Sequence, residues 1–267
     1  MVSWKCDVSD QLKPKQVQVE QLDKPREFDG LKLTKITSDD FDAVMELLLD
    51  DFMKNEPLSN SLDLTREEGY WLFKELALST IGTPVSYAFR APDGKLAAVR
   101  LCNILERPTK DVRYPKLNHK GALLALSLDI AFGKLLQTQN DQQTQKNNEK
   151  AYEIIRIVNE LESKTWGLVG REVKRLINVV ILSCHRNWAR RGLVSKLLEC
   201  DLGDQKRAGI DGAISEATAY NSQQLFAKFG YVPIYEIRHD AWFDEKGRRI
   251  FQCRDKTTTA QLVFKKY

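Results

Sequence analysis

The stretch that most constrains the fold lies at residues 178–198 and reads NVVILSCHRNWARRGLVSKLL. Val179 to Ser183 is a run of apolar and small residues bounded by polar ones, which is typical of a short buried strand. A polar turn follows, and Gly192 opens a segment with the apolar spacing of an amphipathic helix. The sequence therefore predicts a strand, a polar turn and a helix in direct succession.

The turn between this strand and this helix has the properties of an anion-binding site. Backbone N–H groups at a helix N-terminus lack intrahelical partners, and the helix dipole places positive charge at the same end. Three arginines, Arg186, Arg190 and Arg191, add side-chain charge. The turn is neither a P-loop nor a dinucleotide fingerprint, because GKS, GKT and GxGxxG are absent. We expect a phosphorylated ligand, the alternative being an ordinary surface turn.

The composition favours a globular protein and argues against nucleic-acid binding and metal binding. The chain has 267 residues, 42% hydrophobic and 29% charged, which is the balance of a globular protein. Its net charge of +4 is too small to indicate a nucleic-acid partner. The three histidines, His119, His185 and His239, lie far apart, so we predict no metal. The five cysteines lack CxxC spacing, which favours reduced thiols in a cytoplasmic protein.

No segment has the pattern of a membrane span or a secretory signal. The longest apolar stretch, residues 121–136, is interrupted by Asp129 and Lys134, and the first residues carry no apolar core. We therefore expect a cytoplasmic protein with no membrane partner. Residues 1–30 are polar and are expected to form a loosely attached arm, and residues 31–267 a single domain.

The remaining segments predict an alternation of strands and helices. Apolar spacing before residue 106 indicates a strand, two helices and a hairpin, at 31–37, 41–52, 65–79, 86–90 and 96–105. Two further helical patterns lie between residues 106 and 175, at 123–136 and 149–164. The elements expected after the polar turn are a helix, a strand, a helix and two strands, at 192–209, 212–217, 221–229, 235–242 and 261–265.

Residues 181–184 read ILSC, Trp188 follows in the turn, and residues 189–194 form the loop that opens the helix. In this order they resemble motif A of the GNAT N-acyltransferase superfamily, whose loop reads Q/R-x-x-G-x-G/A. Two positions depart from that motif, because Ala189 replaces Gln or Arg and Val194 replaces Gly or Ala. The resemblance implies an α/β chain with the GNAT fold, a central mixed twisted β-sheet flanked by helices.

The resemblance also implies a co-substrate, acetyl-CoA, that lies along the strand and loop of motif A. Relative to the core of the family, residues 106–175 are a helical insertion before motif A. The residues implied in cofactor binding are Leu182, Ser183, Cys184, Ala189, Arg190, Arg191, Gly192, Leu193, Val194 and Ser195.

Two other stretches are similar to the arylalkylamine N-acetyltransferase group. DDFMKNEPLSNSL, at residues 50–62, is similar to its FF-x-x-EPL signature, and this similarity assigns the role of general base to Glu56. SEATAYNSQQLFAKFGY is similar to the C-S-S-x-x-S segment that leads to K-x-G-F, which implies catalytic hydroxyls at Thr218 and Ser222. Phe226 stands where many GNAT enzymes place a tyrosine acid.

The chemistry of amine acetylation explains the need for such a base. An alkylamine has a pKa near that of lysine, about 10, and must lose a proton before its nitrogen attacks a thioester. A carboxylate in the pocket can take that proton, directly or through one water. The alternative for Glu56 is a surface glutamate beside a helix-ending proline. Other candidate bases are Asp50, Asp51 and Glu216.

The other candidate residues also have structural alternatives. Thr218 and Ser222 would hold the substrate or protonate the leaving thiolate, or they would cap the helix that begins beside them. Three aromatic residues, Phe52, Tyr70 and Trp71, are candidates to line a substrate pocket, but their helical spacing favours core packing for at least one.

These features together predict an acetyl-CoA-dependent N-acetyltransferase that acts on the primary amine of a small arylalkylamine by direct attack on the thioester. Two alternatives stay open. The enzyme would acylate another small amine, such as a polyamine or amino sugar, or transfer a longer acyl chain. The chain would otherwise be a CoA-binding regulatory protein without catalysis, because Ala189, Val194 and Phe226 depart from family patterns.

Overall fold

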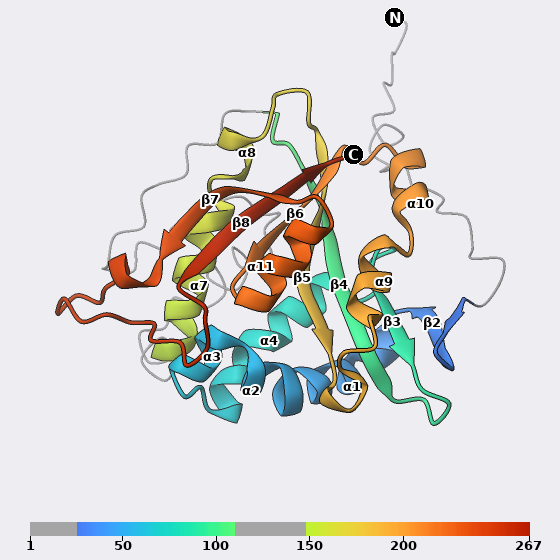
Figure 1. Ribbon diagram of the computed structural model, residues 1–267, viewed down its shortest axis with the longest axis horizontal. Coiled ribbons are helices and arrows are strands. Elements are labelled where there is room, and N and C mark those ends of the chain that lie inside the picture. Colours follow the sequence, from blue (N-terminus) through green and yellow to red (C-terminus); the bar gives the residue numbers. More distant parts are fainter. Residues whose placement is uncertain (1–25, 110–147) are drawn as a thin grey trace, which may run out of the picture.

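The computed structural model describes residues 26–109 and 148–267, in which the strands form one mixed sheet (Figure 1). The strand order is β1-β2-β3-β4-β5-β6-β8-β7, and only the pairing of β5 with β6 is parallel among the described strands. This sheet, with helices on both faces, confirms the predicted fold class. The strands are β1 (Glu27–Phe28), β2 (Leu31–Lys35), β3 (Tyr87–Arg90), β4 (Leu96–Glu106), β5 (Arg175–Cys184), β6 (Gly212–Ala217), β7 (Val232–Arg238) and β8 (Thr259–Lys266).

The helices divide into two groups, one on each face of the sheet (Figure 1). One face is covered by α1 (Phe41–Leu47), α2 (Met53–Asn55), α3 (Pro57–Ser61), α4 (Arg66–Thr80) and α7 (Glu149–Glu162), and the short α8 (Thr165–Leu168) follows α7. The other face is covered by α9 (Leu193–Glu199), α10 (Leu202–Arg207) and α11 (Tyr220–Lys228). Short 3-10 turns occur at Ser38–Asp40, Arg186–Trp188 and His239–Ala241.

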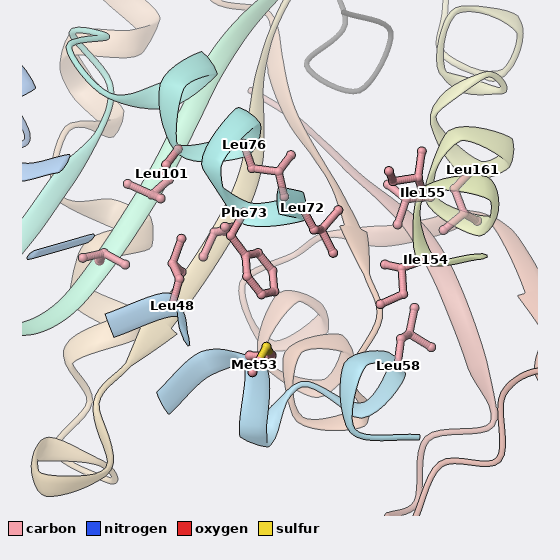
Figure 2. Packing of buried hydrophobic residues seen from close by; sticks show 14 of the residues in the cluster. Leu48, Met53, Leu58, Leu72, Phe73, Leu76, Leu101, Ile154, Ile155 and Leu161 are labelled. Carbon is pink, nitrogen blue, oxygen red and sulfur yellow. The ribbon is translucent and has the colours of Figure 1, made fainter. Parts of the chain in front are cut away.

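The larger part of the core lies under α4 and α7. Figure 2 shows side chains of α4, among them Leu72 and Leu76, in one cluster with Leu58 of α3 and Ile154 of α7. Each is at most 7% exposed, and burying such a side chain contributes about 1.5–3 kcal/mol. This packing fixes α3 and α7 beside the sheet, and both helices contribute to the site described below.

Several helices and strands begin or end where local sequence patterns predict. The α4 helix begins after Thr65, whose hydroxyl accepts from the Glu68 N–H at 3.2 Å, while the Glu68 carboxylate accepts from the Thr65 N–H at 2.9 Å. This capping box is the one that the sequence indicates. The predicted hairpin between β3 and β4 turns at Gly94, whose φ of 85° suits glycine.

The helix predicted from residue 192 to 209 is in fact two helices, α9 and α10, with a break at Asp201. Asp201 is buried and accepts hydrogen bonds from Arg100 at 2.8 Å and Gln205 at 2.7 Å. Burying a charged carboxylate is costly unless it is paired, and Arg100 supplies that partner at the residue where the two helices meet.

Parts of the predicted insertion and arm lie outside the described residues. The pattern at 149–164 is confirmed by α7. The helix expected at 123–136 and most of the arm expected at 1–30 fall in residues that are not described.

Candidate functional site

A cleft opens where the two parallel strands at the centre of the sheet part. The β5–β6 pairing covers only three residue pairs and ends at Asn178 and Ile214. Beyond that point, residues 179–184 of β5 and 215–219 on β6 and after it line a cleft of about 400 Å³. The edge of β5 that faces β6 is therefore without a strand partner there. The Val179 carbonyl accepts from the Ser215 hydroxyl at 2.8 Å. Beyond Val179, this edge is available to pair with an extended polar ligand, as an added strand would.

The loop that follows β5 lies at one end of the cleft. Its Arg190 and Gly192 have positive φ values of 63° and 75°. Such a value is uncommon for a residue other than glycine and is concentrated at functional sites. Among the described residues, the backbone N–H groups of residues 190–195 donate no hydrogen bond. The loop therefore presents a set of free N–H groups, an arrangement that binds anions.

The structure places the predicted cofactor residues in three environments. Leu182, Ser183, Cys184 and Ala189 line the cleft. Arg190, Arg191 and Gly192 are exposed on the loop, where the Arg191 guanidinium donates to the Asp29 carboxylate at 3.1 Å. The remaining three, Leu193, Val194 and Ser195, form the first turn of α9, in which Leu193 is buried in the core.

A buried carboxylate joins this loop to the helices on the other side of the cleft. Asp51 accepts from the Arg186 backbone N–H at 2.9 Å and from its guanidinium Nε at 3.0 Å. Burial alone would raise the pKa of Asp51, but the hydrogen bonds from Arg186 hold the pKa below its ordinary value. The contact spans 135 residues of sequence, so no local pattern predicts it.

Asp51 reaches this position because the helix widens between Leu48 and Phe52, where it forms a π turn. The Met53 N–H there donates to the carbonyl of Leu48, five residues earlier. Such turns insert one residue into a helix and are frequent at functional sites. Here the turn directs Asp51 to the loop and Phe52 to the cleft.

Glu56 lies at the N-terminus of α3, buried to 8% exposure, where the cleft meets a smaller cavity. Its Oε2 accepts from the Ser59 N–H and the Ser59 hydroxyl, each at 2.7 Å, and its Oε1 accepts from the Leu58 N–H at 3.1 Å. Pro57 stands at the first position of α3, where its missing N–H has no cost. Glu56 is thus the cap of α3 and also faces the cleft.

The structure brings Thr218 to Glu56. The Thr218 hydroxyl donates to Glu56 Oε1 at 2.9 Å, across 162 residues of sequence. Ser222 lines the same cleft, but its hydroxyl donates to the Ala219 carbonyl at 2.7 Å in the first turn of α11. Phe226 is buried against Tyr231, with 4.8 Å between the ring centroids, so no hydroxyl stands at its position.

The three aromatic residues predicted to line the substrate pocket lie in different environments. Phe52 lines both the cleft and the smaller cavity, and its ring packs edge-on against Phe73 with 5.6 Å between centroids. Tyr70 is 45% exposed and lines neither space. Trp71 packs on Tyr152 at 5.1 Å, also away from both. Phe52 belongs to the π turn, whereas Tyr70 and Trp71 are adjacent residues of α4 and therefore point to different sides of that helix.

The smaller cavity, of about 60 Å³, contains two glutamates that the sequence reasoning did not group together, Glu162 of α7 and Glu216 of β6. Burial, and then the charge of Glu216, raise the pKa of Glu162 well above its usual value. Burial also raises the pKa of Glu216 to about 7. The available signal for Glu162 is its spacing, four residues after Val158 on the apolar stripe of α7.

Residues 26–109 and 148–267 contain neither a cluster of metal ligands nor a helix that could span a membrane. No three His, Cys, Asp or Glu side chains gather there as a metal site requires. None of the helices there combines the length and the apolar character that crossing a bilayer requires.

Comparison with solved structures identifies the fold. No protein-family model and no curated protein matches the sequence. Arylalkylamine N-acetyltransferase 2 of Aedes aegypti superposes with a TM-score of 0.68 at 24% identity, over 89% of this chain and 99% of that one. A mosquito arylalkylamine N-acetyltransferase-like 5b gives 0.65 at 17% identity, over 89% and 100%. Drosophila melanogaster polyamine N-acetyltransferase, which forms N-acetylagmatine, gives 0.62 at 13%, over 89% and 100%.

These similarities confirm the fold that motif A implies. Their identities are below 25%, so they bear on architecture and not on substrate. The described part of the chain therefore has the GNAT acetyltransferase fold, and the structures it resembles include arylalkylamine and polyamine N-acetyltransferases.

Proposed function

We propose that the protein is an acetyl-CoA-dependent N-acetyltransferase that acetylates the primary amine of a small arylalkylamine. The observation that carries the proposal is the position of the Glu56–Thr218 hydrogen bond, at the junction of the cleft and the smaller cavity. The fold supports acetyl transfer, because the structures that it resembles include several N-acetyltransferases.

The cleft and its loop suit acetyl-CoA. The free N–H groups of residues 190–195 and the exposed side chains of Arg190 and Arg191 would bind the pyrophosphate. The unpaired edge of β5 would hydrogen-bond the amide groups of the pantetheine arm. The thioester would then lie deeper in the cleft, near Glu56. Ala189 and Val194 leave these backbone donors in place, because a side chain does not remove an N–H group.

Glu56 suits the role of general base. The amine enters as an ammonium ion and transfers one proton to the carboxylate, directly or through one water. Its nitrogen lone pair then attacks the thioester carbon, the C–S bond breaks, and the CoA thiolate takes a proton. The four hydrogen bonds that Glu56 accepts hold its carboxylate in one orientation beside the cleft, where the ammonium of a bound amine can come within hydrogen-bond reach.

Thr218 is the better placed of the two hydroxyls to assist. Its hydroxyl contacts Glu56, so a proton taken by the carboxylate can be relayed to the leaving thiolate through Thr218. The Ser222 hydroxyl lines the cleft but donates to Ala219, which leaves it an acceptor toward a ligand. Phe52 and Phe73 form an aromatic wall beside Glu56, which suits the ring of an arylalkylamine.

The test is thiol release from acetyl-CoA with a panel of amines, and calorimetric titration of CoA in parallel. Tryptamine and phenethylamine represent arylalkylamines, spermidine a polyamine and glucosamine an amino sugar. The proposal predicts CoA binding, and thiol release that depends on the arylalkylamines. Thiol release with spermidine or glucosamine, but not with either arylalkylamine, would contradict the proposed substrate class. CoA binding without release with any amine would indicate a regulatory CoA-binding protein instead.

A further inference from the structure

The inner end of the smaller cavity has a polar lining that base catalysis by Glu56 does not use. Glu162 of α7 and Asn178 of β5 line this cavity and not the larger cleft, while Glu216 of β6 lines both, as Glu56 and Thr218 do. Asn178 lies two residues after Leu176, and Glu216 two residues after Ile214. Because strand side chains alternate, both polar residues point to the face that α4 and α7 cover.

These three side chains lack the partners that buried polar groups normally have. Glu162 is 5% exposed and makes no hydrogen bond or ion pair with any residue of the described ranges. The Glu216 Oε1 is buried without a hydrogen-bond donor. Asn178 is 4% exposed, and its Oδ1 is also buried without a donor. Buried polar groups are rarely left unsatisfied, and each such group requires an explanation.

The charge at this end of the cavity is also uncompensated. No lysine, arginine or histidine is among the described residues that line the cavity. Burying carboxylates without a partner costs free energy, and a protein tolerates that cost mostly where the group is used. The missing partner is therefore a hydrogen-bond donor or a cation.

Size restricts the kind of group that can enter. The cavity volume of about 60 Å³ is enough for several waters, because one water needs about 10–15 Å³. It is less than half of the roughly 150 Å³ of an engineered cavity that holds benzene. A compact polar group therefore fits between the two carboxylates, while the aromatic ring of a substrate would have to stay in the adjoining cleft of about 400 Å³, which Glu56 and Phe52 also line.

We propose that Glu162, Glu216 and Asn178 form an acceptor subsite that binds a hydrogen-bond donor at the end of the substrate opposite its reacting amine. The proposal rests on the function proposed above, because the reacting nitrogen is placed at Glu56. Glu56 and Thr218 line the outer part of the same cavity, so one molecule can reach both ends. The donor is a hydroxyl on the ring of an arylalkylamine or the second ammonium of a diamine.

The raised pKa values of the two glutamates agree with this geometry. Burial raises the pKa of both carboxyls, and the charge of Glu216 raises that of Glu162 further, so ionisation of both at once is disfavoured. A hydroxyl donor needs only one ionised carboxylate, whereas an ammonium would favour ionisation of both.

The experiment compares kcat/KM for two matched pairs of amines. Tyramine and phenethylamine differ by one ring hydroxyl, and 1,5-diaminopentane and pentylamine differ by the second ammonium. The subsite predicts a preference of about 10- to 100-fold for the donor-bearing member of at least one pair, which is the effect of one hydrogen bond to a charged group. The pair that shows the preference identifies the donor.

The variants Glu162→Gln and Glu216→Gln then test whether these two carboxylates cause the preference for the donor-bearing amine. Each keeps the shape of the side chain, and each is expected to reduce the ratio of kcat/KM between the donor-bearing and the donor-free amine at least several-fold. Glu160→Gln is the matched control on α7, because Glu160 pairs with Lys164 at 2.7 Å outside the cavity. It is expected to leave the preference unchanged.

The outcomes separate the two proposals. If no amine is acetylated, the proposed function fails. If amines are acetylated but neither pair shows a preference in the wild type, the subsite is refuted while the function stands, and this result needs no variant. A preference that persists in folded Glu162→Gln and folded Glu216→Gln would also refute the subsite.

Discussion

At the scale of single residues, Glu56 caps a helix and is also the proposed general base. Its carboxylate caps α3 through the N–H groups of Leu58 and Ser59, and it also receives the hydroxyl of Thr218 from beyond β6. A cap holds a side chain in one rotamer, so the local sequence that starts α3 also fixes the orientation of the proposed base. The proline after Glu56 is part of the same local structure.

The two hydroxyls near the proposed base are expected to respond differently to removal. Thr218→Val deletes the hydrogen bond to Glu56 and should lower kcat/KM about 10- to 100-fold. Ser222→Ala deletes a hydrogen bond to the Ala219 carbonyl, so it should cost about 0.5–1.5 kcal/mol of unfolding free energy with a much smaller loss of kcat. Steady-state kinetics and urea unfolding of both variants make the comparison. A larger loss of kcat in Ser222→Ala would reverse the assignment.

At the scale of elements, the π turn of residues 48–52 and the loop after β5 act together. Asp51 links the helices that carry Glu56 to the loop that is proposed to bind CoA. The link fixes the relative position of the proposed base and the proposed thioester site. A change at either element is therefore expected to affect the other.

Asp51→Asn tests this link. The variant keeps the shape of the side chain but loses its negative charge and one acceptor oxygen, which weakens the contact with Arg186, so the loop should lose order. We expect CoA affinity to fall about 10-fold and the free energy of unfolding to fall by about 1–3 kcal/mol. Calorimetry and urea unfolding measure the two effects. Asp42→Asn, an exposed position on α1, is the control, and an Asp51→Asn variant equal to it would contradict the link.

Gly192→Glu tests the loop itself. Gly192 has a φ of 75° and nothing within 4 Å of a Cβ placed there, so the substitution adds backbone strain and a negative charge without a steric clash. Gly82, with a φ of 79° and equally open surroundings, gives the matched variant Gly82→Glu. Both should lose similar stability, but only Gly192→Glu should lose CoA affinity, by at least 10-fold, in calorimetry. Equal CoA affinity of the two variants would place the pyrophosphate elsewhere.

At the scale of the whole molecule, the two faces of the sheet contribute different parts of the proposed site. The core under α4 and α7 surrounds the smaller cavity, where the amine is proposed to bind, and the other face carries α9 and the loop that is proposed to bind CoA. Figure 1 shows these helices on opposite faces of the sheet. The two ends meet where β5 and β6 part. The same divergence of strands thus supplies both the cofactor cleft and the way to the inner cavity.

Much of this architecture follows from local patterns, and the rest depends on contacts between distant segments. The capping box at Thr65, the strand of motif A and the helix ending before Gly230 are read from adjacent residues, and the structure has all three. The break at Asp201 and the link from Asp51 to Arg186 depend on partners about 100 residues or more away. The unpaired glutamates of the cavity depend on burial, which a single sequence does not report.

The inner cavity should leave a signature in the pH dependence of stability. The pKa of Glu216 is about 7 in the folded protein and about 4.3 in an unfolded chain, so the folded state binds more protons between these values. The free energy of unfolding should therefore fall as pH rises from about 4 to about 7. Urea unfolding of Glu216→Gln should show a smaller fall, and Glu160→Gln the wild-type fall. Identical slopes for wild type and Glu216→Gln would contradict the burial of a titrating Glu216.

The most direct test of the account is the turnover of Glu56→Gln at neutral pH with saturating acetyl-CoA. Glutamine keeps the size of the side chain but cannot take a proton from the ammonium, so kcat should fall about 10²- to 10⁴-fold while acetyl-CoA affinity persists. Activity should partly recover at high pH, where the free amine is abundant. Glu46→Gln, an exposed carboxylate on α1, should match the wild type. A folded Glu56→Gln protein with wild-type turnover would contradict the account, because the base would then lie elsewhere.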